Sequence, residues 1–189
     1  MIASAGKLLS IGLLLLGLAP AVDGEPPVVE TAPPDSRTVC GAHEYRALAH
    51  SAFSGAQGFD RAVGTVARVV GVDSALLRAV VATESSGNPH ARSQVGAVGL
   101  TQLMPVAVRQ YGPEAGRLLG RSPDPLNGID NLLMGALYYR DALRRAHGNI
   151  EHAARLYHGG PNLALHGPRT IAYGRKIAGR YRQLTRVTA

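Results

Sequence analysis

The sequence has 189 residues, enough for one domain with a sizeable core, and 46% of them are hydrophobic. Its 20 lysines and arginines outnumber its 13 acidic residues, which gives a formal net charge of +7 at pH 7, so we expect an anionic partner such as a cell wall, an envelope surface or nucleic acid. Cys40 is the only cysteine, which excludes an internal disulfide. It is expected to be a small buried side chain, or else to pair with another chain.

The first segment predicts a targeting peptide. An apolar run follows Lys7 and ends at the small residues Ala19-Pro20-Ala21, and it is shorter than the roughly 20 residues that a membrane-spanning helix needs. We therefore predict a cleaved signal peptide over residues 1–21, rather than an uncleaved anchor, and a periplasmic or exported protein with no transmembrane anchor after cleavage. Residues 22–39, rich in proline and acidic residues, are predicted to be a linker, and residues 40–189 to be the folded domain.

The rest of the chain predicts an all-α domain of six to eight short helices, because strand-like alternation is scarce. In chain order, helices are expected over 42–70 (one or two weak helices), 73–86 with Asp73 or Ser74 as N-cap, 100–104, Pro105 to just before Gly112, 129–147 with Gly148 as terminator, 150–158 capped by Asn149, and 170–185. The loops at 87–99, 112–128 and 159–169 are where we expect a groove to be built.

The helix expected over 73–86 carries an acid within an apolar stripe. Its face is formed at i, i+3, i+4 and i+7 by Leu77, Val80, Val81 and Glu84. A carboxyl at the end of a buried face is partly desolvated, which disfavours its charged form and can keep it protonated near neutral pH. Such an acid is suited to protonating the oxygen of a glycosidic bond. The alternative is a helix-end glutamate that turns to solvent, since perturbed carboxylates are often structural.

Two further stretches carry groups that suit a sugar ligand. Residues 93–105 combine small residues with Gln102, whose amide can donate to and accept from sugar hydroxyls, and with Met104, an adaptable apolar contact. Residues 150–161 place Tyr157 on an apolar helical stripe, so we expect it to be buried with its hydroxyl bonded. Taken singly, each has a structural alternative: a surface amide, a core methionine, and a core tyrosine bonded to a backbone carbonyl.

Together these stretches resemble the soluble-type lytic transglycosylases, lysozyme-like enzymes that cleave bacterial peptidoglycan. The resemblance covers about residues 66–182, and its motifs come in the family's order. They are Leu76-Leu77 before Glu84-Ser85 and Asn88-Pro89; Ser93, Gly96-Ala97 and Gly99-Leu100-Thr101-Gln102-Leu103-Met104-Pro105; Asp124-Pro125, Asn131, Gly135-Ala136 and Tyr138-Tyr139; Ala154, Tyr157 and Gly159-Gly160-Pro161; and Thr170 with Tyr173. One such motif would be a weak signal, but the ordered set is a strong one.

The resemblance implies a lysozyme-like bundle of short helices with a glycan-binding groove. It implies that Glu84 is the sole catalytic carboxylate and that Tyr157 hydrogen-bonds and orients it. The side chains expected to bind the glycan are Ser93, Gln102, Met104, Tyr157 and His158. Neither a metal nor another cofactor is expected, because the seven histidines lack a compelling ligand spacing.

The sequence departs from the family's usual pattern at three places. Thr101 stands where methionine is usual, Tyr157-His158-Gly159-Gly160 replaces Tyr-Asn-Ala-Gly, and Arg169-Thr170 replaces Glu-Thr. His158 could still donate to a sugar or acetamido oxygen, but it titrates near neutrality, so we expect an unusual pH dependence. The loss of the acid at position 169 is expected to remove one substrate contact and to change which wall strands are accepted.

A single acid suffices on this substrate. Glu84 would protonate the oxygen between N-acetylmuramic acid and N-acetylglucosamine, and the muramic acid's own C6 hydroxyl would then attack C1 to give a 1,6-anhydro sugar. One alternative is a lysozyme-type muramidase, in which water attacks instead. Another is a non-catalytic peptidoglycan-binding assembly module, which only His158 and Arg169 favour.

The expected partners are peptidoglycan glycan strands. One small domain after a short linker also suggests local wall opening for a secretion or conjugation apparatus. The basic final helix is more typical of a solvated face than of a nucleic-acid interface, so no nucleic-acid partner is predicted.

Overall fold

The computed structural model describes residues 55–186. Its elements are α2 (Gly55–Val70), α3 (Ser74–Glu84), α4 (Pro105–Leu119), α5 (Gly128–Arg145), α6 (Ile150–Gly159), the 3₁₀ helix η1 (Leu163–Leu165) and α7 (Pro168–Arg186). Between residues 55 and 186 no strand forms, which confirms the all-α prediction for this region. The predicted signal peptide, the linker, Cys40 and any helix over 42–54 lie outside the described residues.

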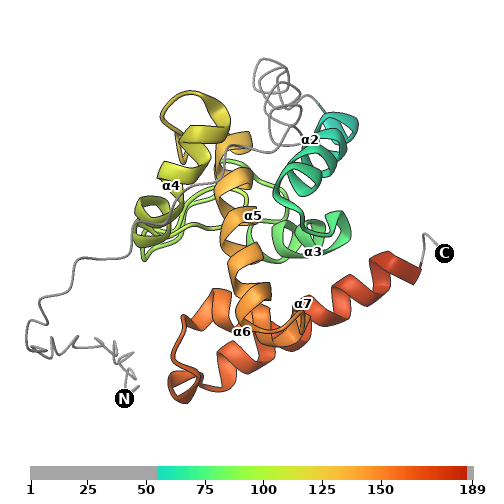
Figure 1. Ribbon diagram of the computed structural model, residues 1–189. Helices are drawn as coiled ribbons and strands as arrows, with labels where there is room; N and C mark the ends of the chain where they lie inside the picture. The colour runs from blue at the N-terminus through green and yellow to red at the C-terminus, as the bar shows by residue number, and fades with distance from the viewer. Residues whose placement is uncertain (1–54, 187–189) are drawn as a thin grey trace, which may run out of the picture. The chain divides into compact units, whose positions relative to one another are not determined.

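Helix α5 runs through the middle of the helical domain, with α4 on one side of it and α2 and α3 on the other (Figure 1). Helices α6 and α7 cross near its C-terminal end, and α7 packs against both α3 and α6. Among the helices described, none is both long and apolar enough to cross a bilayer.

Helix α3 lies between two hydrophobic cores. Leu77 and Val81 pack into the core formed with α2, α4 and the first half of α5, while Leu76 and Val80 pack into the core formed with α6, α7 and the end of α5. Burying each of these side chains stabilises the fold by about 1.5–3 kcal/mol. Because both flanks of α3 are packed, the position of Glu84 at its C-terminal end is set by both cores.

The helix ends follow the local signals in the sequence. Asp73 caps α3 and Asn149 caps α6, each through a side-chain oxygen that accepts a hydrogen bond from a backbone amide in the first turn. Gly148 follows α5 at φ +80°, a left-handed conformation that glycine adopts readily. These three predictions are confirmed.

The predicted end of α4 is wrong. The helix does not stop before Gly112 but continues through Pro113 to Leu119. Its buried residues recur every four positions and form one stripe: Ala107, Tyr111, Ala115 and Leu119. Burial of this stripe outweighs the cost of a proline inside the helix. The loop predicted over 112–128 therefore shrinks to 120–127.

The helix predicted over 100–104 is also wrong, because this stretch belongs to an irregular loop over residues 91–104. Two antiparallel bridges through Val98 fold the loop back on itself. Gly99 and Gln102 have φ values of +76° and +48°, and a right-handed helix cannot contain these left-handed residues.

Asn131 of α5 fastens this loop to the helical core. Its side chain is fully buried: Nδ2 donates to the carbonyls of Val98 and Pro125 at 2.9 and 3.0 Å, and Oδ1 accepts from the backbone N and the Oγ1 of Thr101 at 3.0 and 2.8 Å. A Cβ atom on Gly99 would lie 2.2 Å from Asn131 Nδ2. The close approach of the amide therefore requires glycine at position 99.

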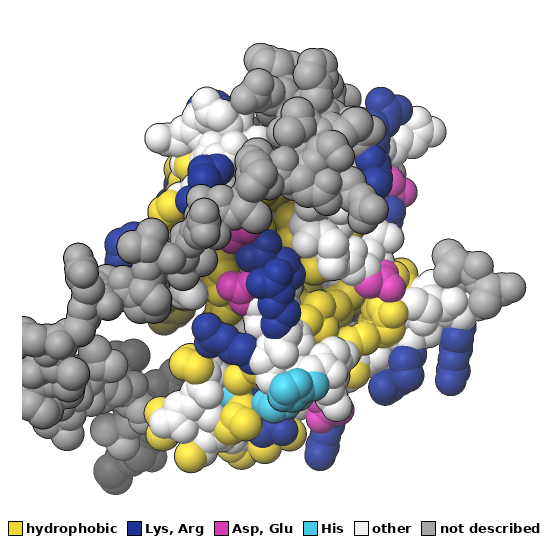
Figure 2. Space-filling model, in the orientation of Figure 1, with side chains coloured by type: hydrophobic (Ala, Val, Ile, Leu, Met, Phe, Trp, Pro, Cys, Tyr) yellow, Lys and Arg dark blue, Asp and Glu magenta, His cyan; other side chains and the backbone are white. Residues whose placement is uncertain are grey.

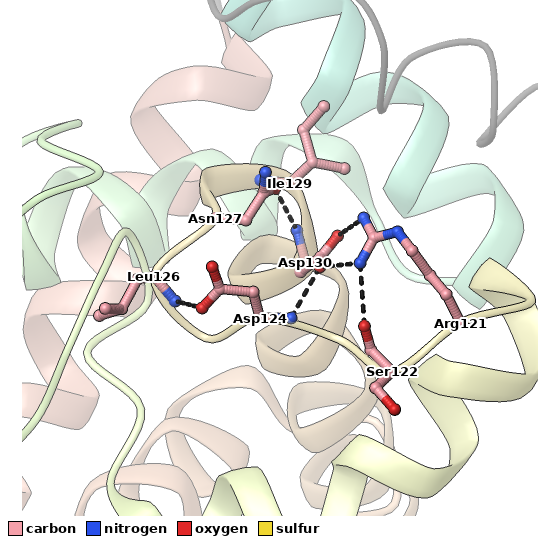
Figure 3. Close-up of polar contacts among 7 residues, drawn as sticks. All are labelled: Arg121, Ser122, Asp124, Leu126, Asn127, Ile129 and Asp130. Atoms are coloured by element: carbon pink, nitrogen blue, oxygen red, sulfur yellow. Dashed lines mark hydrogen bonds and ion pairs between the residues drawn. The ribbon is translucent and has the colours of Figure 1, made fainter.

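The neighbouring Asp130 fastens the connection between α4 and α5 (Figure 3). Its fully buried carboxylate accepts two hydrogen bonds from Arg121, at 2.6 and 2.8 Å, and one from the backbone amide of Asp124 at 2.8 Å. Bidentate pairing with arginine compensates a buried carboxylate well. The carboxylate of Asp124 in turn accepts from the amide of Leu126 at 2.8 Å. These two acids hold the loop in shape.

Candidate active site

A cavity of about 530 Å³ opens at the C-terminal end of α3. Its lining includes all six residues that the sequence singled out, namely Glu84, Ser93, Gln102, Met104, Tyr157 and His158. They come from α3, the 91–104 loop and α6, and Gln110 of α4 and Tyr138 of α5 complete the polar wall. The expected 112–128 loop supplies none of the lining residues.

Glu84 is partly buried, and the stripe that leads to it is buried as predicted. Burial raises the pKa of Glu84 above its ordinary value of 4.5, while the hydrogen bond from Tyr173 and the charge of Lys176 lower the pKa in part. The net shift is upward. The carboxyl therefore holds its proton to a higher pH than an exposed glutamate does.

Tyr173 of α7, and not Tyr157, contacts the acid. The Tyr173 hydroxyl donates to Glu84 Oε1 at 2.5 Å, whereas the Tyr157 hydroxyl donates to the carbonyl oxygen of Thr101 at 2.7 Å. The predicted bond between Tyr157 and Glu84 is therefore wrong, although Tyr157 is buried and its hydroxyl bonded as expected. The sequence signal for Tyr173 was its place in the last family motif, but only the packing of α7 on α3 brings it to Glu84.

Two buried tyrosines, Tyr139 and Tyr157, and the partly buried Tyr173 lie near the acid and remain neutral. Burial, followed by the negative charge of Glu84, raises the pKa of Tyr139, Tyr157 and Tyr173 well above 10. The ring centroids of Tyr139 and Tyr157 are 5.0 Å apart. The hydroxyl of Tyr139 is buried and has no hydrogen-bond partner within residues 55–186. The side chains near Glu84 are therefore largely aromatic.

The 91–104 loop is tied to the end of α3 by Ser85, whose Oγ donates to the carbonyl of Leu100 at 2.8 Å. This bond, together with the bond from Tyr157 to the neighbouring carbonyl, fixes the loop beside Glu84. The loop thus forms one side of the cavity, which it lines with Ser93, Val95, Ala97, Gln102, Leu103 and Met104.

Gln102 and Ser93 present fewer free groups to a ligand than their side chains suggest. The Nε2 of Gln102 donates to the carbonyls of Gly99 and Ala91 at 2.9 and 3.2 Å, which uses both of its hydrogens. A ligand can therefore meet Gln102 only at Oε1, as an acceptor. The Oγ of Ser93 accepts from the amide of Ala97 at 2.9 Å and keeps its own hydrogen for donation.

His158 is coupled to the acid through Tyr173. Its ring stacks on the Tyr173 ring with centroids 4.6 Å apart, and its Nδ1 lies 3.0 Å from Thr170 Oγ1. Burial, with a smaller contribution from His166, lowers the pKa of His158 below its ordinary value of 6.5. The imidazole is therefore neutral at neutral pH and can donate or accept without carrying charge.

Three apolar side chains form an exposed edge to the cavity. Val95, Val106 and Met104 are 71%, 60% and 39% exposed, and all three belong to the lining. Exposed apolar groups next to a few polar ones are typical of a ligand-binding site. They match the mixed apolar and hydroxyl-bearing faces of a sugar ring.

Among the residues that the structure describes, Glu84 is the only carboxylate in this lining. Other acids are engaged elsewhere: Glu114 pairs with Arg140 at 2.8 Å, and Asp73 caps α3. In the same part of the chain, no group of three or more histidines, cysteines and acids is placed to hold a metal ion.

Replacing Glu84 with glutamine is expected to stabilise the protein, and more so at higher pH. Below the unfolded pKa, near 4.5, the glutamate is neutral in both states; above its raised folded pKa, the folded state must hold a partly desolvated charge. The stabilisation should therefore appear as the pH rises between these two pKa values. Denaturant unfolding of both proteins at pH 4 and pH 7.5 measures it, and a parent that gains stability over the variant with rising pH would contradict the burial.

Two solved structures share this fold. An inactive mutant of the lytic transglycosylase Slt from Pseudomonas aeruginosa matches 67% of this chain and 24% of its own, with a TM-score of 0.55 and 22% identity. The 70 kDa soluble lytic transglycosylase of Escherichia coli matches 78% of this chain and 31% of its own, with a TM-score of 0.53 and 18% identity. The domain therefore has the lysozyme-like fold of these proteins, as the sequence predicted.

The chain belongs to the transglycosylase SLT domain family, which it matches over residues 63–167. A protein of Enterobacteria phage PRD1 named transglycosylase is 37% identical over 124 residues, which cover 66% of this chain and 43% of that protein. Membrane-bound lytic murein transglycosylase E of Buchnera aphidicola is 41% identical over 63 residues, 33% of this chain and 27% of that protein. The chain thus spans less than half the length of each of these relatives.

Proposed function

We propose that this chain is a peptidoglycan lytic transglycosylase, which cleaves the β-1,4 bond between N-acetylmuramic acid and N-acetylglucosamine and leaves a 1,6-anhydro-muramic end. The observation that carries the proposal is a single carboxyl of raised pKa, Glu84, in the lining of a cavity whose other groups suit sugars. Membership of the family and the names of its relatives support the same activity.

In the first step Glu84 acts as an acid. Its proton passes to the glycosidic oxygen, the bond from that oxygen to C1 of the muramic acid breaks, and the substrate's acetamido group stabilises the cation that develops at C1. The raised pKa of Glu84 keeps the proton in place until this step. Within residues 55–186 the lining supplies no second carboxylate, so the substrate's own acetamido group takes the part that a second carboxylate plays in other glycosidases.

In the second step Glu84 acts as a base. The carboxylate takes the proton of the muramic acid's C6 hydroxyl while O6 bonds to C1, so the proton gained equals the proton given and no water is consumed. An attached hydroxyl has an effective concentration of up to about 10⁵–10⁸ M in well-oriented cases, so it can compete with water. Between the steps, the hydrogen bond from Tyr173 at 2.5 Å stabilises and orients the charged carboxylate.

Digestion of purified peptidoglycan, followed by mass analysis of the soluble fragments, tests the function. Anhydro ends are one water lighter than the reducing ends that a lysozyme-type hydrolase leaves. Fragments with reducing ends only would replace the transglycosylase with a muramidase. Binding without any release of fragments would favour an assembly module.

Replacing Tyr173 with phenylalanine is expected to lower kcat about 10- to 100-fold and to move the alkaline limb of the pH–rate profile upward. The first step needs protonated Glu84, so activity falls as pH rises through its folded pKa, and removing a bond that lowers this pKa shifts the fall to higher pH. Tyr157→Phe is the matched control, because its hydroxyl bonds a backbone carbonyl. If Tyr157→Phe moved the limb and Tyr173→Phe did not, their assigned contacts would be reversed.

We also propose that the protein is exported through the signal peptide predicted over residues 1–21 and that it opens the wall locally for a secretion or conjugation apparatus. The apolar run after Lys7 and the compact size of the matched region, residues 63–167, support this placement. Fractionation of cells tests export. Co-purification of envelope-spanning components, or their consistent absence, tests the local role.

A further inference from the structure

The turn between α6 and α7 carries exposed apolar side chains that the active site does not use. Leu163 and Leu165 of η1 are 44% and 76% exposed, and Ala164 between them is exposed as well. None of the three lines the cavity that holds Glu84. Apolar side chains that gather on a surface mark contact with a protein or a membrane, so this turn is a candidate for a second interaction.

The turn is closed by hydrogen bonds of its own. The amide of Ala164 donates to Asn162 Oδ1, the amide of Leu165 to the carbonyl of Asn162, and the amide of His166 to the carbonyl of Leu163, each at 3.1 Å. At the base of the turn the buried ring of His166 places Nε2 2.9 Å from the carbonyl oxygen of the residue that caps α6. Because three consecutive amides are already bonded, the turn can leave water without exposing unpaired donors to an apolar phase.

The chain that follows the turn is strongly basic. No aspartate or glutamate follows Glu151 in the sequence, and α7 contains only basic residues among its charged ones. Five of these side chains are exposed, and within residues 55–186 none of them takes part in an ion pair: Arg169, Arg175, Lys176, Arg182 and Arg186. Figure 2 shows hydrophobic side chains at the lower left, where η1 lies in Figure 1, and lysine and arginine side chains along the lower edge of α7.

An apolar tip next to exposed cations fits the surface of an anionic bilayer. The apolar side chains enter the boundary between headgroups and acyl chains, and the cations meet the lipid phosphates. A soluble polyanion would pair with the cations but leave Leu163 and Leu165 in water. A protein partner would need an apolar pocket with acids at its rim, whereas a bilayer presents both layers wherever the turn approaches it.

We propose that η1 and the exposed face of α7 form a peripheral docking surface for a bilayer of anionic phospholipid. Leu163 and Leu165 enter the bilayer, and the cations of α7 lie on its phosphates. Docking uses none of the groups that cleave glycan, so it is separate from catalysis. Gly160, just before the turn, belongs to the lining of the cavity that holds Glu84. Docking therefore holds this cavity close to the membrane surface and favours the strands that lie nearest to it.

The sequence contains no tryptophan, so a single tryptophan placed at the turn reports on its own surroundings. Leu165→Trp is mixed with vesicles of equal parts phosphatidylglycerol and phosphatidylcholine. Its fluorescence is expected to move to shorter wavelength and to be quenched by lipids with brominated acyl chains. Leu126→Trp is the matched control: Leu126 is also exposed, but it precedes the N-terminal end of α5, whereas α6 and α7 lie near the other end. Unchanged emission from Leu165→Trp, or equal shifts at both positions, would overturn the proposal.

Sedimentation with the same vesicles measures affinity. Replacing both Leu163 and Leu165 with serine is expected to weaken binding at least about tenfold, as loss of two buried leucines does. Replacing both Arg175 and Arg182 with glutamine is expected to weaken it about tenfold and to make it less sensitive to salt. All variants share the rest of the chain, so the differences report on these positions alone.

Three outcomes of the sedimentation would overturn the docking surface. The leucine variant binding as tightly as the parent would leave a site for polyanions only. Equal binding of the parent to vesicles of phosphatidylcholine alone would remove the role of the cations. A parent that ignores vesicles and self-associates through the turn would make it a protein interface. The leucine variant should still cleave peptidoglycan within about twofold of the parent, and a parent that cleaves none would overturn the proposed function while the vesicles still decide the docking.

Discussion

Glu84→Gln is expected to keep the fold and to reduce the release of fragments from peptidoglycan by about 10³-fold or more, as loss of an essential general acid does. Glutamine has the same shape and still accepts the bond from Tyr173, but it has no proton to give to the glycosidic oxygen and cannot take one from the C6 hydroxyl. Both steps are lost together because one group performs both.

The decisive comparison uses three variants and purified peptidoglycan. Glu151→Gln, which removes an acid from the first turn of α6, should leave turnover within about twofold of the parent. Glu84→Asp keeps the acid but draws it back by one methylene, so it should show low but measurable activity. If Glu84→Gln cleared peptidoglycan at the parental rate, the assignment of the acid would be wrong.

Asn131→Ala is expected to lower the free energy of unfolding by about 4 kcal/mol, near the top of the range for single substitutions. The amide is fully buried, and its removal leaves the carbonyls of Val98 and Pro125 and the amide of Thr101 without this partner. Each buried group left unpaired costs about 1–3 kcal/mol. Loss of the anchor also frees the 91–104 loop, so activity should fall even where the protein remains folded.

Denaturant unfolding at neutral pH measures this effect, and Asn149→Ala is the matched control. Asn149 caps α6 through one hydrogen bond at an exposed position, so its loss should cost only about 1 kcal/mol. A change below about 1 kcal/mol for Asn131→Ala would show that the loop is held by other contacts. Full activity in that variant would show that the loop does not need its anchor.

The helix ends that the sequence predicted correctly are those marked by a capping residue or a glycine terminator. Helix α3 begins after Asp73, α6 begins after Asn149, and α5 ends before Gly148, because caps and terminators act within a few residues. The end of α4 was missed because Gly112 and Pro113 favour a stop locally, while burial of its stripe favours continuation. That burial depends on packing against α5, a separate helix that begins only at Gly128, so signals within α4 do not show it.

The candidate site, like the fold, was only partly predictable from the sequence. Motif order was enough to select six residues that line one cavity, from Glu84 to His158. It was not enough to choose between Tyr157 and Tyr173 as the partner of the acid, since both lie on apolar helix faces. Nor could it show that the amide nitrogen of Gln102 is used within its own loop, which follows from a left-handed backbone at that residue.

The sequence by itself determined the all-α class, the positions of most helices and the presence of one acid at the end of an apolar stripe. Periodicity, caps and motifs are local features, each contained in a short stretch of the chain. Only the tertiary structure decided that Tyr173, 89 residues away, bonds Glu84, and that Asn131 of α5 fastens the 91–104 loop. Hydrogen bonds and cavities of this kind depend on how α3, α5, α6 and α7 pack, and side-chain packing between distant segments leaves no local pattern in the chain.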